Sequence, residues 1–218
     1  REISSAAQME INAKRSWQKL ELLLAANFGK GDLHVVFTYD DEHLPPDREA
    51  AVKLMKKLIQ QLRAHRRARG QETRYIYVTE QLSSEGGRLH HHMVLNGTGE
   101  DLEVLRSLWP YGEVELEGLD VWQGYEALAK YLTKEPRECG RAEPGARTWA
   151  ASIGLKKPKV ESEIVKDNLT VAAPPGAIIL SAPPPARNEF GEFVMLKYYL
   201  PRREEKKGTR PPRRRRRE

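Results

Sequence analysis

Residues 74–95, RYIYVTEQLSSEGGRLHHHMVL, decide the fold of this chain. The first part, 74–80, is rich in β-branched and aromatic residues, which favour strands, and the last part, 89–95, ends in an apolar run. The loop QLSSEGG at 81–87 joins the two parts, and its serines and glycines are typical of a turn. This pattern predicts two strands that pair as a hairpin.

The segments on either side predict the rest of a sheet with helices around it. The hairpin follows a strand and an amphipathic helix, and a second helix and a fourth strand follow the hairpin. This β-α-β-β-α-β order is that of an α+β fold with a ferredoxin-like, or RRM-like, antiparallel sheet. The expected elements outside the hairpin are helix 4–27, strand 33–39, a helix from the N-cap Asp47 to about Gly70, helix 102–108, strand 114–119 and helix 125–134.

The domain organisation follows from where these patterns weaken. We expect residues 1–160 to form one domain that includes the N-terminal helix, and residues 161–206 to form a C-terminal extension packed on it. Within the extension, residues 177–180 and 189–200 predict short strands. Residues 207–218 carry seven basic side chains and one acidic one, which predicts a disordered basic tail.

Composition excludes several classes of protein. No segment approaches the roughly 18–20 consecutive apolar residues of a membrane span, so we expect no membrane partner. Cys139 is the only cysteine, which excludes a disulfide-built secreted domain and a zinc finger built on cysteine pairs. The sequence starts at Arg1 without a charged and then apolar leader, so we expect a trimmed chain without a signal peptide and a cytoplasmic location.

Charge and motifs narrow the possible partners. The net charge is +6, and residues 207–218 account for all of it, so any nucleic-acid binding by the rest of the chain must come from local basic clusters. No GxxxxGK[ST] motif is present, so this chain holds no Walker-type ATPase, and any strand unwinding must come from another protein.

The three consecutive histidines at 90–92 carry the clearest chemical signal. Side chains alternate faces along a strand, so His90 and His92 project together while His91 points the other way. Glu80 ends the partner strand and can add a carboxylate. Two imidazoles and one carboxylate suit Mn²⁺ or Mg²⁺ in a site that handles phosphate, with Zn²⁺ as an alternative. The competing interpretation is a solvated polar strand face.

A second candidate group lies in the predicted helix YEALAKYLTK. Tyr131 and Lys134 are three residues apart and share a helix face. A tyrosine can act as a covalent nucleophile when a nearby cation favours its phenolate, and Lys134 could be that cation or could hold a phosphate. The competing interpretation is an amphipathic surface. Tyr125 is interpreted as structural, and no partner spacing gives a role to the remaining histidines, His34, His43 and His65.

Three stretches in this order resemble the HUH endonucleases, in particular the rolling-circle replication initiators (Rep) of phages and plasmids. VVFTYDDEHLPP at 35–46 looks like the first motif of that family, RLHHHMVL at 88–95 like the second and YLTKEP at 131–136 like the third. The later WAASIGLKKPK at 149–159 is also similar to these proteins. The resemblance therefore extends over most of the expected first domain.

The resemblance implies a role for each matching residue. His90 and His92 correspond to the two metal-binding histidines, Glu80 to the acidic third ligand, Tyr131 to the nucleophile and Lys134 to the lysine that follows it. It also implies one divalent ion, Mn²⁺ or Mg²⁺, and a 5′-phosphotyrosyl intermediate. His91 stands where the family has a bulky apolar residue, which leaves a shifted set of ligands open. Ala127 stands where a second tyrosine would be, so the chain resembles the single-tyrosine type.

The same resemblance implies the partners and leaves alternatives open. The expected partners are single-stranded DNA, with an origin hairpin, and a separate helicase and host replication proteins in a prokaryotic cell. The alternatives are a single-tyrosine HUH transposase, a single-strand nucleic-acid-binding module without catalysis, and a hydrolase that uses a metal-activated water. The candidate DNA-binding residues, basic side chains and one aromatic, are Arg88, Arg137, Arg141, Arg147, Trp149, Lys156, Lys157 and Lys159.

Overall fold

The computed structural model describes residues 6–81, 87–120, 122, 124–134, 148–159, 161, 171–189 and 191–200. The chain divides into two compact units, Arg1–Ser162 and Glu163–Glu218. Within the described residues, no helix is both long and apolar enough to cross a membrane. The basic tail expected at 207–218 lies outside the described residues.

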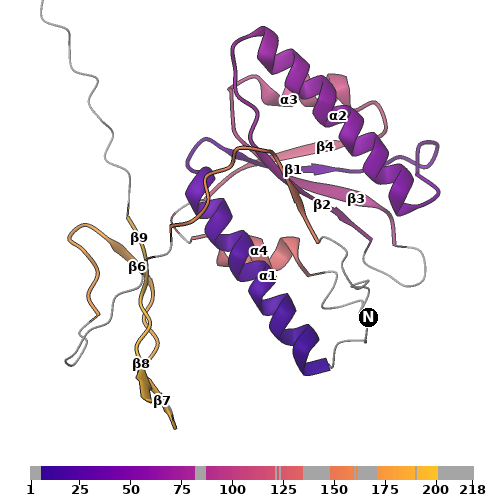
Figure 1. Cartoon of the computed structure of the whole chain (residues 1–218). Helices are drawn as coiled ribbons and strands as arrows, with labels where there is room; N and C mark the ends of the chain where they lie inside the picture. Colours follow the sequence, from indigo (N-terminus) through magenta and orange to yellow (C-terminus); the bar gives the residue numbers. More distant parts are fainter. Residues whose placement is uncertain are drawn as a thin grey trace, which may run out of the picture. The chain divides into compact units, whose positions relative to one another are not determined.

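A five-stranded antiparallel sheet forms the centre of the first unit (Figure 1). The strand order is β4-β1-β3-β2-β5, so the two hairpin strands lie beside β1 rather than at one edge. The predicted α+β, ferredoxin-like sheet is confirmed, and a short fifth strand was not predicted. The strands are β1 (Leu33–Phe37), β2 (Tyr75–Glu80), β3 (His90–Leu95), β4 (Val114–Gly118) and β5 (Ala150–Ala151).

Helices cover both faces of this sheet (Figure 1). Helices α2 (Arg48–Ala68) and α3 (Asp101–Leu108) lie on one face. Helices α1 (Ala6–Asn27) and α4 (Glu126–Leu132) pack together on the other. The sheet is therefore buried on two sides, which explains why β3 is buried from His91 to Leu95 although it begins with three histidines.

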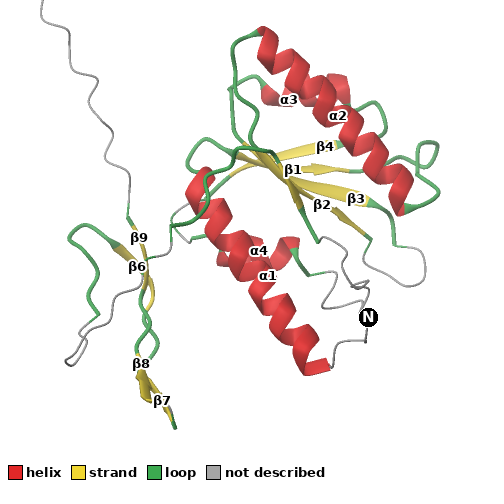
Figure 2. Ribbon diagram, in the orientation of Figure 1, coloured by secondary structure: helices red, strands yellow, loops and turns green. Residues whose placement is uncertain are grey.

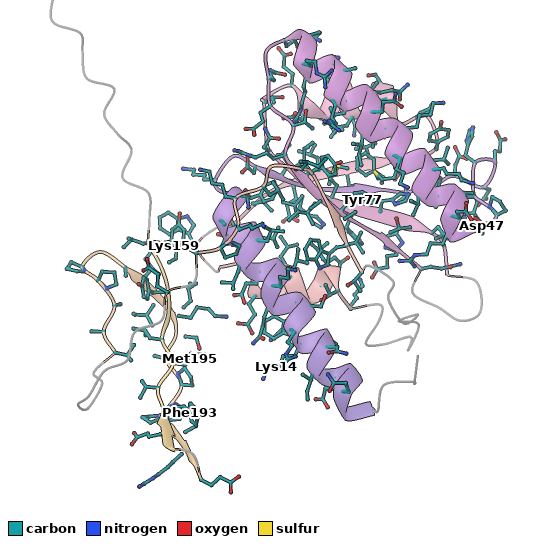
Figure 3. All side chains as sticks on the ribbon, in the orientation of Figure 1. Lys14, Asp47, Tyr77, Lys159, Phe193 and Met195 are labelled. Atoms are coloured by element: carbon teal, nitrogen blue, oxygen red, sulfur yellow. The ribbon has the colours of Figure 1, made fainter. Side chains whose placement is uncertain are left out.

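Helix α2 has both of its ends specified by sequence. Asp47, labelled in Figure 3, is the predicted N-cap, and its side chain accepts a hydrogen bond from the backbone N–H of Ala50 at 2.7 Å. At the other end Gly70 adopts φ +67°, and the N–H groups of Gly70 and Gln71 donate to the carbonyls of Arg67 and Arg66. This is a Schellman motif, which favours glycine at the left-handed position.

The main apolar core lies between the sheet and the helices α2 and α3. Buried side chains from alternate strand positions, among them Phe37 and Met93, meet Leu58 of α2 and Trp109 at the end of α3. Figure 3 labels Tyr77, which belongs to the same core. Packing of this kind holds β1 and β3 in one register, and a one-residue slip would exchange the two faces of each strand.

The second unit contains two short hairpins (Figure 2). Strand β6 (Ile178–Ser181) pairs with β9 (Lys197–Tyr199), and β7 (Ala186–Asn188) pairs with β8 (Gly191–Phe193). The single strand predicted at 189–200 is therefore wrong, because its two halves have different partner strands. The sequence did not predict β7.

Candidate active site

The register of the β2–β3 hairpin builds one polar group on the face that α1 and α4 cover. Glu80 is paired directly with His90, and Val78 is paired with His92. Residues two apart in a strand share a face, so Glu80, His90 and His92 project together. One possible ligand atom from each of them lies within 4.8 Å of the others. The predicted meeting of these three side chains is confirmed.

A single carboxylate oxygen links the two histidines. Oε2 of Glu80 accepts a hydrogen bond from Nε2 of His90 at 2.7 Å and another from Nε2 of His92 at 2.9 Å. Burial by itself raises the pKa of Glu80, but these hydrogen bonds, with the charges of His92 and Lys134, outweigh it and lower the pKa to about 2. Glu80 is therefore a carboxylate at neutral pH, although it is only 2% exposed.

The three residues fit a divalent metal ion. Two imidazole nitrogens and one ionised carboxylate are a donor set that transition metals and Mn²⁺ accept. Nδ1 of His90 lies 3.1 Å from the carbonyl oxygen of Arg88, which can take the ring proton and leave Nε2 free as a ligand. Burial lowers the pKa of His90, but its hydrogen bond to Glu80 outweighs burial and raises it. A metal must therefore displace a proton from this ring.

His34 belongs to this site, and the sequence analysis missed it. Its Nε2 lies 3.3 Å from Nδ1 of His92, and the two rings stack with centroids 5.4 Å apart. Burial, with a smaller effect from the charge of His92, lowers the pKa of His34 to about 4. The signal was spatial, because His34 and His92 meet only when β1 lies beside β3.

Tyr131 and Lys134 reach the same group from helix α4. The Tyr131 ring packs edge-on against His92 with centroids 5.1 Å apart, and it remains 42% exposed. Nζ of Lys134 lies 3.3 Å from Oε1 of Glu80 and 3.8 Å from the centre of the Tyr131 ring. The helix ends at Leu132 instead of including Lys134, as predicted, but a turn still brings the ammonium over the ring.

His91 points to the opposite face and is not in the metal-ligand group. Its Nε2 lies 2.7 Å from the hydroxyl of Tyr39, and its Nδ1 lies 2.9 Å from the hydroxyl of Thr79. Burial, with smaller effects from neighbouring charges, lowers the pKa of His91 to about 3, so the ring is neutral. His91 thus fills a core position against Trp109, and the shifted ligand set is not what the geometry supports.

The candidate DNA-binding residues are only partly described, and those described do not join the metal-ligand group. Arg88 pairs with Asp41 and donates to the backbone carbonyl of Tyr39, so its guanidinium is already engaged. Lys159 pairs with Glu161, while Lys156 and Lys157 are exposed and Trp149 is half-buried. Arg137, Arg141 and Arg147 lie outside the described residues.

Two other residues can be placed. Tyr125 is buried, and its hydroxyl donates to the carbonyl of Phe28 at 2.7 Å, which fits its structural interpretation. His43, given no role from the sequence, forms an exposed pair with Asp40 at 2.7 Å. Both sites lie outside the metal-ligand group.

Comparison with known proteins agrees with the resemblance of the three motifs. No curated protein and no solved structure matches the chain. Residues 32–136 match a family model of replication-associated proteins of the ORF2 type. These residues span β1 to β4, α4 and every side chain placed in the site, and the family is one of rolling-circle replication initiators.

Proposed function

We propose that this chain is a single-tyrosine HUH endonuclease that nicks single-stranded DNA at a replication origin and so initiates rolling-circle replication. The contact of Tyr131 with His92 carries the proposal, because it puts an exposed phenol beside a buried group fit to hold a metal. The family match over residues 32–136 supports a role in replication initiation.

In this proposal Tyr131 performs the covalent step. Its phenolic oxygen attacks the phosphorus of the scissile phosphodiester and forms a new O–P bond, while the bond to the 3′ oxygen breaks. The products are a 5′-phosphotyrosyl link and a strand end with a free 3′-hydroxyl, which takes up a proton. The link conserves the phosphodiester, so reversing the reaction with another 3′-hydroxyl can join strands.

The neighbouring residues prepare Tyr131 and hold the metal. Lys134, whose ammonium lies over the Tyr131 ring, favours loss of the phenolic proton. His90, His92 and Glu80 would hold one Mn²⁺ or Mg²⁺ ion, which when bound supplies a Lewis acid for the phosphate oxygens. Burial of Glu80 and His92 fixes these donors before substrate arrives.

The remaining parts of the proposal follow from the resemblance. The substrate is single-stranded DNA with an origin hairpin, in the cytoplasm of a prokaryotic host, and a separate helicase and host replication proteins complete the reaction. Residues 1–160 are the HUH domain, and 161–206 are an extension packed on it. The basic candidates from Arg88 to Lys159 are proposed to contact the DNA backbone.

A denaturing gel tests this function. The full chain is mixed with a randomised single-stranded DNA pool that includes hairpins, with Mn²⁺ or with EDTA. We expect a Mn²⁺-dependent adduct that resists denaturation and is lost in Tyr131→Phe and His92→Ala. Tyr198→Phe is the matched control, because Tyr198 is also 42% exposed but lies on β9.

Other results would point to the alternatives. Cleavage without an adduct that survives Tyr131→Phe would indicate a hydrolase. DNA binding without cleavage would indicate a binding module. Sequencing the trapped strands would separate an origin from transposon ends.

A further inference from the structure

An open groove of about 600 Å³ runs along the site between β4 and α4. Tyr131 and His34, which both contact His92, form part of its wall, so the groove is continuous with the proposed active site. Val36 and Leu128 add apolar surface. A strand of DNA that brings a phosphate to Tyr131 therefore has this groove next to it.

Two carboxylates give the groove a definite polarity. In the pairing of β4 with β1, Glu115 lies opposite Val36 and Glu117 lies opposite His34. Cross-strand partners project to the same face, so both glutamates lie on the face that carries His92. Both are exposed and both line the groove.

This polarity favours a base over a phosphate as the occupant. Two carboxylates repel the DNA backbone, whereas they accept hydrogen bonds from the N–H groups of a base. In a single strand the Watson–Crick edge is free to be read in this way. Only guanine presents two adjacent donors there, N1–H and N2–H, while each other base places an acceptor beside its donor.

We propose that this groove binds a guanine next to the scissile phosphate, with N1–H and N2–H donating to the carboxylates of Glu115 and Glu117. The apolar wall of Val36 and Leu128 packs against the base plane. The inference rests on the proposed function, because Tyr131 locates the strand. It goes beyond that function by assigning a base-specific site to an edge strand.

The test uses the full chain and a strand selected from the randomised pool. Binding is measured by fluorescence anisotropy in EDTA, so that it does not depend on cleavage. Every guanine within three nucleotides of the nick is replaced in turn by inosine, which lacks only the 2-amino group. Without a nick, the strand that binds most tightly is scanned along its whole length. The proteins are wild type, Glu115→Ala, Glu117→Ala and the double variant, with Glu103→Ala as control because Glu103 is exposed on α3.

We expect one inosine position to weaken wild-type binding by about tenfold, within the range for a good base contact. The double variant should lose most of this discrimination, and Glu103→Ala should keep it. A wild type that binds guanine and inosine strands equally overturns the inference whatever the variants do, and so does a double variant that still discriminates. A wild type that discriminates but forms no adduct with Mn²⁺ overturns the proposed nicking and not the guanine site.

Discussion

His34 and His92 face each other with 3.3 Å between Nε2 of the first and Nδ1 of the second. His92 is thus held from both sides, since its Nε2 is bonded to Glu80. For Nε2 of His92 to bind a metal, the ring proton must sit on Nδ1, where the neutral His34 can accept it. The burial that lowers the pKa of His34 to about 4 keeps it neutral.

The first prediction is that His34→Ala weakens Mn²⁺ binding. Loss of a partner that orients a metal ligand typically reduces metal affinity by about 10–100-fold. Titration calorimetry of the full chain with Mn²⁺ measures this. His34→Gln should recover part of the affinity, because its amide oxygen can also accept from Nδ1, and His65→Ala should bind as wild type. Equal affinities for His34→Ala and wild type would contradict this role.

The second prediction separates His91 from its neighbours. His91→Leu removes the ring that bonds the buried hydroxyls of Tyr39 and Thr79, and an unsatisfied buried polar group costs about 1–3 kcal/mol. We expect urea unfolding to show a loss of this order while Mn²⁺ affinity stays unchanged. His92→Leu should abolish Mn²⁺ binding. The reverse pattern would show that His91 is a ligand.

The alternation of strand residues explains how much of this site was predictable. Glu80, His90 and His92 lie on one hairpin, so local pairing and the two-residue period were sufficient to bring them together. Tyr131 and Lys134 were recognised as a pair, but only their resemblance to a known motif connected them to the histidines. Nothing local indicates that α4 packs over β3.

His34, Glu115 and Glu117 show where sequence reasoning stopped. Each is an ordinary polar residue of a strand, and each gains its meaning from the order β4-β1-β3, which joins strands distant in the chain. The strand of two residues at Ala150–Ala151 escaped for another reason: so short an element has no periodicity to detect.

The third prediction concerns the buried ion pair of Arg66 and Asp101, 2.6 Å apart. Burial raises the pKa of Asp101, but hydrogen bonds from Thr98 and Arg66, and the charge of Arg66, outweigh it and lower the pKa. A lowered folded-state pKa means that this stabilisation is complete above the unfolded pKa, about 4, and is lost as pH falls through the folded value. Asp101→Asn leaves Arg66 unpaired and should cost about 3–5 kcal/mol at pH 7.

Urea unfolding of both proteins between pH 7 and pH 2 tests this linkage. The difference in unfolding free energy between wild type and Asp101→Asn should be constant above about pH 5 and shrink in more acidic solution. The comparison cancels Glu80, whose own pKa of about 2 gives both proteins the same acid sensitivity. A difference that grows as pH falls would contradict the assignment.

The fourth prediction assigns Lys134 two opposing effects. Its ammonium occupies Oε1 of Glu80 at 3.3 Å and lies 3.8 Å from the centre of the Tyr131 ring. Lys134→Met removes a cation that competes with a metal for Glu80, so Mn²⁺ should bind at least as tightly. The same change removes the charge that favours the Tyr131 phenolate, so the single-turnover rate of adduct formation should fall by about 10²–10³-fold, as for loss of one preorganised electrostatic contact. Lys130→Met is the control, since Lys130 pairs with Glu126 on the same helix.

The two readings for Lys134→Met are made on one preparation, because their opposite signs distinguish the role of Lys134 from damage to the fold. A misfolded variant loses rate and Mn²⁺ binding together. If the lysine only anchors α4 to the sheet through Glu80, Lys134→Gln should restore the rate by keeping a hydrogen bond to the carboxylate. If its charge acts on Tyr131, Lys134→Gln stays slow and Lys134→Arg recovers part of the rate.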